Sequence, residues 1–272
     1  MSTMMRRQMP LLCFLWLGLL AQTAYGDTSK LRIVMLIIAS DTPSYYQGMQ
    51  SLWRLYMNTD QKHFLVFFIK SGLPEGGPEY RIYGDTIFTT GDEGIPGLLH
   101  RTVSSIRAVE QILHGKYDYI IRTNLSSFYF LPRALKFIDA LPRTGAYSGS
   151  IVFNQFASGC GFTMSRDVAL FLVDFVDEHP DIVNEGKDDL VIGKIFREHL
   201  NIKIINAPRV NLESVNGFNN QWLRSVEDFT QFHWRLKLTP SYLRHKEELE
   251  HMAKLISRLY GINATDHSEF ST

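Results

Sequence analysis

A continuous apolar run from Leu31 to Ala39 constrains the fold of this chain more than any other feature. Apart from Arg32 it consists of apolar residues, several of them β-branched, without the polar alternation of a half-exposed strand. Such a run is typical of a strand that is covered on both faces. Three further segments, His63–Ile69, Asp85–Thr89 and Tyr117–Arg122, predict strands of the same sheet.

Segments of helical periodicity separate these strands. Apolar side chains recur at helical spacing between Tyr46 and Tyr56, and Leu98–His114 alternates polar and apolar residues at the same period. Gly115 then stands where a helix C-terminal cap is expected. Strands that alternate with helices indicate an α/β fold, with a mainly parallel sheet flanked by helices. Near the C-terminus, Tyr242–Tyr260 predicts a charged surface helix that ends at Gly261.

Residues 1–26 have the pattern of a secretory signal peptide. Arg6 and Arg7 form a basic start, and Leu11–Leu20 is a short apolar core. Ala24-Tyr25-Gly26 then supplies small residues for cleavage. Because the apolar core is about half of the roughly 20 residues that span a bilayer, cleavage is favoured over an uncleaved signal anchor, which alone would tie the chain to a membrane. We expect residues 27–272 to form one domain in the secretory pathway (the Golgi or endoplasmic reticulum lumen) or outside the cell.

Composition excludes several classes of protein. Basic and acidic residues number 28 each, so the formal net charge is zero, which argues against a nucleic-acid partner bound through its backbone. A hydrophobic content of 45% is that of a globular protein rather than a disordered chain. Once residues 1–26 are removed, Cys160 is the only cysteine, so no disulfide can form within the chain.

Three blocks of polar and glycine residues lie between Tyr117 and Gly193. The first is a polar loop at a strand end, Arg122-Thr123-Asn124-Leu125-Ser126-Ser127-Phe128. A glycine-rich segment at 157–167 follows, and the pair Asp188-Asp189 closes the set. In α/β enzymes ligands meet the carboxyl ends of the strands, so we expect these blocks to form one site for a nucleotide-activated substrate.

The three blocks resemble those of the β-1,3-galactosyltransferase and Fringe family of nucleotide-sugar transferases. That family has Lys-Thr-Asp-Asp-Asp-Val-Phe at the loop, Ser-Gly-x-Gly-Tyr-x-x-Ser-Arg-Asp at the glycine-rich segment and Glu-Asp-Val-x-x-Gly at the acidic pair. The resemblance covers roughly residues 30–240. It implies a single domain of the GT-A type and an inverting glycosyltransferase. Its substrates would be a nucleotide sugar, by resemblance a UDP-linked hexose or N-acetylhexosamine, and a glycan or glycoprotein acceptor.

The loop departs from the family where the family binds a metal ion. Two aspartates of the family loop hold a divalent metal that bridges the donor's diphosphate, whereas this chain has Asn124 and Ser126. Neutral oxygen ligands cannot offset the desolvation of a dication as carboxylates do. The resemblance therefore implies a donor site without a metal, and manganese is not favoured as a cofactor. Taken alone, the loop also fits an ordinary polar turn after a strand.

Without a metal, cationic side chains must stabilise the diphosphate, and the planar fork of arginine can hold two phosphate oxygens. The candidates are Arg101, Arg122 and Arg235. By resemblance, the segment around Arg235 matches a C-terminal stretch of the family in which a histidine, here His233, completes the metal site. The alternatives are a strand edge whose basic residues face water, and a histidine with a structural role.

Ser158, Gly159 and Gly161 are the candidates in the glycine-rich block. Glycine lets a backbone approach a bound sugar closely, and Ser165 is placed to cap a following helix. We therefore expect Ser158, Gly159 and Gly161 to line the nucleotide-sugar site. The alternative is a glycine-rich hairpin that leads into a helix.

In the family, the second acid of the third block is the general base, and Asp189 occupies that position. Such a carboxylate removes the proton from the acceptor hydroxyl as that oxygen attacks the anomeric carbon. Asp188 and Asp189 also suit the start of a helix, where carboxylates favour the helix dipole. Two other functions compete with the transferase. One is a catalytically silent relative that binds a glycan or protein; the other is a secreted nucleotide-phosphate hydrolase, for which the sequence has no Gly-rich phosphate loop.

Overall fold

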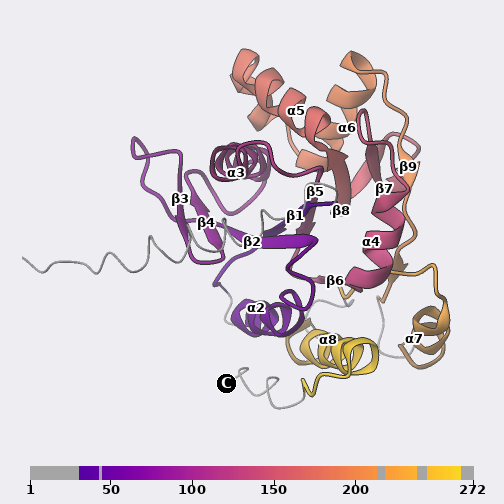
Figure 1. Ribbon diagram of the computed structural model, residues 1–272. Helices are drawn as coiled ribbons and strands as arrows, with labels where there is room; N and C mark the ends of the chain where they lie inside the picture. The colour runs from indigo at the N-terminus through magenta and orange to yellow at the C-terminus, as the bar shows by residue number, and fades with distance from the viewer. Residues whose placement is uncertain (1–30, 43–44, 213–217, 238–243, 265–272) are drawn as a thin grey trace, which may run out of the picture. The chain divides into compact units, whose positions relative to one another are not determined.

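The computed structural model describes residues 31–42, 45–212, 218–237 and 244–264. The strands of its central sheet are β1 (Ile33–Ile38), β2 (Phe64–Ser71), β3 (Tyr80–Tyr83), β4 (Thr86–Thr89), β5 (Tyr119–Asn124), β7 (Tyr147–Val152), β8 (Phe156–Ser165) and β9 (Ile205–Asn206). Within the described residues these eight strands lie in the order β3-β4-β2-β1-β5-β8-β7-β9 (Figure 1).

The middle of this sheet is parallel. β4, β2, β1 and β5 run in one direction, with Ile33 of β1 opposite Phe64 of β2 and Tyr119 of β5. β3 and β8 are antiparallel to their neighbours, β7 is antiparallel to β8, and β9 is parallel to β7. The glycine-rich block forms most of β8, the second strand of a hairpin that leads into helix α5 (Arg166–Glu178). The predicted α/β fold with a mostly parallel sheet is confirmed.

Helices cover both faces of the sheet (Figure 1). One face carries α5 together with α3 (Leu98–Leu113) and α6 (Asp188–His199), which follows the short 3-10 helix η1 (Pro180–Asn184). The other carries α2 (Tyr45–Tyr56), α4 (Leu131–Asp139), α7 (Phe218–Glu227) and α8 (Arg244–Tyr260). The side chains of β1 alternate between the two layers, since Ile33, Met35 and Ile37 join one hydrophobic cluster and Val34 and Leu36 join the other. The apolar run is thus buried on both faces, as its sequence predicts.

A second, three-stranded sheet adjoins the end of β5. Its strands are β6 (Ser127–Tyr129), β10 (Val210–Asn211) and β11 (His233–Arg235), in the order β10-β11-β6. β11 is antiparallel to β6, so that Arg235 lies opposite Ser127 and His233 lies opposite Tyr129. This pairing brings the basic segment near the C-terminus beside the loop that follows β5.

Helix α8 is more deeply packed than its sequence predicts. It ends at Tyr260, with Gly261 at a φ of 68°, as expected of a glycine C-terminal cap. However, Leu249, Met252 and Ile256 are fully buried in the core. These residues form an apolar stripe at i, i+3 and i+7 that the many charged residues of the helix obscure in the sequence. The expectation of a surface helix is therefore wrong for this face.

The N-terminal segment expected to be a signal peptide, 1–26, lies outside the described residues. All residues that are described belong to one compact unit. No helix in this part of the chain is long and apolar enough to cross a membrane.

Candidate functional site

The predicted loop lies where the strand order of the central sheet reverses. From β1 the chain continues to β2 on one side, whereas β5 lies on the other side of β1. Asn124 at the end of β5 pairs with Ile38 at the end of β1. Ligands of open α/β sheets bind outside the carboxyl ends of the strands at such a switch point. The loop Asn124–Ser126 thus occupies the part of the fold where a ligand site is expected.

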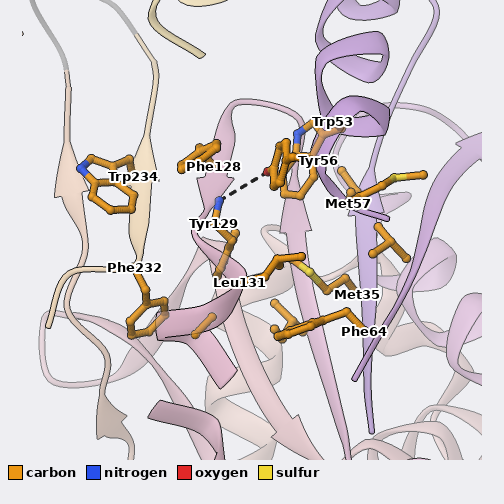
Figure 2. Close-up of a cluster of buried hydrophobic side chains, with 14 of the residues drawn as sticks. Met35, Trp53, Tyr56, Met57, Phe64, Phe128, Tyr129, Leu131, Phe232 and Trp234 are labelled. Atoms are coloured by element: carbon orange, nitrogen blue, oxygen red, sulfur yellow. Dashed lines mark hydrogen bonds between the residues drawn. The ribbon is translucent and has the colours of Figure 1, made fainter. Parts of the chain in front are cut away.

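A cluster of buried aromatic side chains supports this loop from α2 and the second sheet (Figure 2). The indole Nε1 of Trp53 donates a hydrogen bond to the carbonyl oxygen of Leu125 (3.1 Å), and both residues are buried. Tyr56 packs against Phe128 with ring centroids 5.0 Å apart, and Trp234 packs against Phe128 at 5.7 Å. Rings packed this closely fix the backbone at the base of the loop.

The polar side chains of the loop bond to one another and to β8. The hydroxyl of Ser126 donates to Oδ1 of Asn124 (3.0 Å), so the two positions that carry metal-binding aspartates in the resembling family bond to each other. The hydroxyls of Thr123 and Ser127 donate to the carbonyl oxygen of Cys160 (2.7 and 2.6 Å). Among the residues that the structure describes, no group of three or more His, Cys, Asp or Glu side chains could hold a metal ion.

The two glycines of β8 lie against protein side chains. A Cβ atom at Gly159 would lie 3.1 Å from Oδ2 of Asp189 and 3.2 Å from Nη1 of Arg122. A Cβ atom at Gly161 would overlap the hydroxyl of Tyr129. The absence of a side chain at both positions therefore allows close packing within the protein.

Arg122, Asp188, Asp189 and Gly159 form a closed network that joins β5, β8 and α6. Nη2 of Arg122 donates to Oδ2 of Asp188 (2.5 Å), and Nη1 of Arg122 donates to the carbonyl oxygen of Gly159. The N–H of Gly159 donates in turn to Oδ2 of Asp189 (2.8 Å). Arg122 and Asp188 are 3% and 4% exposed, whereas Asp189 is partly exposed. The first acid of the pair is therefore part of an internal ion pair, and only the second reaches the surface.

Arg101 lies near this network, on α3. It is 1% exposed, and its Nη2 donates to the carbonyl oxygen of Glu93 (2.8 Å). Its Nε and Nη1 have no hydrogen-bond partner among the described residues. Burial, and next the charge of Arg122, lower the pKa of Arg101, while burial raises the pKa of Asp188 against the opposing effect of Arg122. Neither of these two arginines reaches the surface, where a diphosphate would bind.

β11 brings Arg235 to the loop. The N–H of Leu236 donates to the carbonyl oxygen of Ser126 (2.6 Å), and Arg235 lies opposite Ser127. Arg235 is partly exposed, and its Nε is buried without a hydrogen-bond partner in the described part of the chain. Of the three arginines expected to bind the donor, Arg235 is therefore the one that lies at the edge of the loop and reaches solvent.

His233 is buried and neutral. Its ring stacks on that of Tyr129 with centroids 4.2 Å apart. Burial, followed by the charges of Arg209 and Arg235, holds the pKa of His233 well below its ordinary value. This environment matches the alternative of a structural histidine. Arg209 was missed by the sequence analysis, because no motif or periodicity marks it and only the pairing of β10 with β11 brings it near His233.

The structure thus gathers the three sequence blocks and the segment around Arg235 in one place. Ser158, the remaining candidate, is buried beside Gly159, and its hydroxyl accepts a long hydrogen bond from the N–H of Cys160 (3.4 Å).

A cleft of about 490 Å³ lies elsewhere, at the carboxyl ends of β2 and β4, and Thr90 and His100 are among its lining residues. None of the candidate residues lines that cleft.

Comparison with known proteins does not assign the chain to a family. The sequence matches no protein-family model and no curated protein. The resemblance to the β-1,3-galactosyltransferase and Fringe family therefore rests on sequence motifs alone. Any functional conclusion depends on what the side chains of the site can do.

Proposed function

We propose that this chain is an inverting glycosyltransferase of the GT-A type. It moves a hexose or N-acetylhexosamine from a nucleotide sugar, UDP-linked by family resemblance, to a glycan or glycoprotein acceptor in the secretory pathway. The observation that carries the proposal is the contrast within the acidic pair. Asp188 is held in a buried ion pair, while Asp189 presents a partly exposed carboxylate, oriented by the N–H of Gly159, beside the loop at the switch point.

Asp189 has the features of a general base for an acceptor hydroxyl. Its Oδ2 accepts the N–H of Gly159 (2.8 Å) and its Oδ1 accepts the N–H of Leu190 (3.0 Å). A carboxylate offers about four lone-pair positions, so each oxygen keeps one for an incoming proton. The acceptor hydroxyl gives its proton to Asp189 while its oxygen attacks the anomeric carbon from the face opposite the diphosphate. The nucleoside diphosphate leaves with the bonding electrons, and the configuration at the anomeric carbon inverts.

Arginines in and next to the second sheet stabilise the negative charge of the departing diphosphate. Arg235 lies beside the loop, and its Nε has no hydrogen-bond partner among the residues that the structure describes. Arg235 and Arg209 both lower the pKa of His233, so they create a positive potential there. A guanidinium can hold two phosphate oxygens and needs no metal. Arg101 and Arg122, which are buried, do not serve this purpose.

Calorimetric titration with UDP in EDTA tests metal-independent donor binding. Wild-type protein should bind UDP, and Arg235→Gln should weaken binding by roughly 1.5–3 kcal/mol, the usual strength of a hydrogen bond to a charged group. Arg143→Gln, which alters an exposed arginine after α4, is the matched control and should change nothing. Affinity that appears only with manganese contradicts the proposal. Changing both Asn124→Asp and Ser126→Asp should create such a dependence.

A catalytically silent glycan- or protein-binding module is the second candidate. It is favoured by the self-bonded neutral loop and by the burial of Arg101 and Arg122, which leave fewer cations for a leaving group. The two functions differ in turnover. Binding of a glycan without release of nucleotide from any of the UDP-, GDP- or CMP-linked sugars would establish the binding module instead.

A further inference from the structure

We propose that Arg122 is a positioning residue, which sets the orientation of the Asp189 carboxylate through the backbone of Gly159, and is not a ligand of the donor's phosphates. This inference rests on the proposed role of Asp189. It concerns a different question, namely how the carboxylate is held in place before any substrate binds.

The guanidinium of Arg122 is already engaged inside the protein. It is 3% exposed, its Nη2 bonds to Asp188, and its Nη1 bonds to the carbonyl oxygen of Gly159. Its Cζ also lies 5.7 Å from the ring centroid of Phe162. Its Nε is buried without a hydrogen-bond partner among the described residues, and a phosphate that displaced Asp188 to reach the guanidinium would leave a buried carboxylate without its counter-charge.

Gly159 connects Arg122 to Asp189. Its carbonyl oxygen accepts from Arg122, and its N–H donates to Oδ2 of Asp189 (2.8 Å). Asp188 and Asp189 are joined by a peptide bond, so the four residues close a ring: Arg122 to Asp188, Asp188 to Asp189, Asp189 to Gly159, and Gly159 back to Arg122. Because a Cβ at Gly159 would come within 3.2 Å of both charged side chains, only glycine allows this approach without displacement.

The ring holds the first turn of α6 against β8. Gly186, just before α6, has a φ of 125°, a backbone conformation that glycine adopts more readily than other residues. The network is a polar attachment between β8 and the start of α6, where Asp189 lies. Loss of the fork of Arg122 should free Gly159 and, with it, the carboxylate of Asp189.

The double variant Arg122→Met with Asp188→Leu separates positioning from simple loss of fold. Leucine has the same number of side-chain heavy atoms as aspartate, and apolar replacement of a buried ion pair is often neutral for stability. Arg122→Lys is the second variant. Lysine keeps a charge for Asp188 but lacks the fork that also reaches Gly159.

The N–H of Gly159 reports the contact directly in ¹⁵N NMR spectra of the full chain. Because this N–H donates to Oδ2 of Asp189, Asp189→Asn should change its chemical shift. In both Arg122 variants we expect the Gly159 amide resonance to move and its exchange to accelerate at least about tenfold, while amides in the middle of β8 stay protected. Where transfer is measurable, kcat should fall about 10–100-fold with the donor KM unchanged.

Two results would overturn the inference. One is a folded Arg122 variant in which the Gly159 amide keeps its shift and protection. The other is a loss of UDP affinity of about tenfold or more with the Gly159 amide unaffected, which would make Arg122 a phosphate ligand. If the wild type transfers no sugar while its Gly159 amide behaves as expected, the transferase proposal fails and the positioning role of Arg122 stands.

Discussion

Gly193 of α6 offers a sharp test of how closely this helix packs on β8. It lies one helical turn after Asp189, and a Cβ atom at this position would overlap the Cβ of Phe156. The same atom would lie 2.9 Å from the Cα of Phe156 and 3.1 Å from the carbonyl oxygen of Gln155. Backbone atoms cannot rotate away as the end of a side chain can. Gly193→Ala must therefore push α6 away from β8.

Two effects of opposite sign decide the outcome. Alanine is favoured over glycine in a helix interior by roughly 1 kcal/mol. Overpacking of a well-packed core costs about 1–3 kcal/mol, and the upper part of this range applies because the neighbour is backbone. Displacement of α6 also weakens the 2.8 Å bond between Gly159 and Asp189, which adds about 1 kcal/mol. We expect Gly193→Ala to lose about 2 kcal/mol of unfolding free energy, or roughly 4–8 °C in Tm.

Gly48→Ala is the matched control. Gly48 is also a buried helical glycine, in α2, but its Cβ would meet only the side-chain tip of Leu249, at 3.1 and 3.3 Å. That tip can adjust, so we expect a change within about 1 kcal/mol of the wild type. Urea denaturation of the three proteins measures the difference. A Gly193→Ala protein as stable as the wild type, or equal losses in both variants, would refute the packing argument.

Three further predictions concern stability. Burial, and next Lys254, lower the pKa of His251 from 6.5 to about 4, so the unfolded chain binds a proton between these pH values that the folded chain does not. Acidification from pH 7 to pH 5 should thus remove about 2 kcal/mol through this group. Urea denaturation across pH should show a flatter profile for His251→Gln, and an unchanged profile would contradict the assignment. Trp53→Phe should lose about 1–3 kcal/mol because the carbonyl oxygen of Leu125 loses its buried donor, and an unchanged denaturation midpoint would argue against this bond. Phe153 at the β7–β8 turn is 85% exposed with a φ of 50°, so Phe153→Gly should raise the unfolding free energy by about 0.5–1 kcal/mol, and a lower midpoint would count against the strain.

Local sequence signals predicted the elements that depend on local chemistry. The apolar run at 31–39 predicted a strand buried on both faces because, apart from Arg32, its residues are apolar and show no polar alternation. Helix α3 ends as Gly115 suggested, with His114 and Gly115 both at positive φ. The paired acids begin α6, where the helix dipole favours them.

Features that depend on distant contacts could not be predicted from the sequence. Ser165 occupies the N-cap position of α5, but its hydroxyl donates to Asp167 (2.6 Å) and accepts the N–H of Ala146 instead of a helix N–H. Arg122 looks like a ligand of phosphate in its motif, yet Asp188, 66 residues later, takes up its charge. Arg209 has no local signature at all. Ala146, Asp188 and His233, the partners of Ser165, Arg122 and Arg209, lie far away in the sequence, and only the assembled fold brings them close.

Nucleotide release from UDP-sugars, measured in EDTA with an acceptor glycan and with Asp189→Asn as the test variant, addresses the proposed chemistry most directly. Asparagine keeps an oxygen for the N–H of Gly159 but cannot take the proton of an acceptor hydroxyl. We predict that the wild type releases UDP, that Asp189→Asn lowers kcat by about 10²–10⁴-fold with unchanged UDP affinity, and that Asp139→Asn on the exposed side of α4 has no effect. An Asp189→Asn protein that turns over at the wild-type rate would contradict the assignment of Asp189 as the general base.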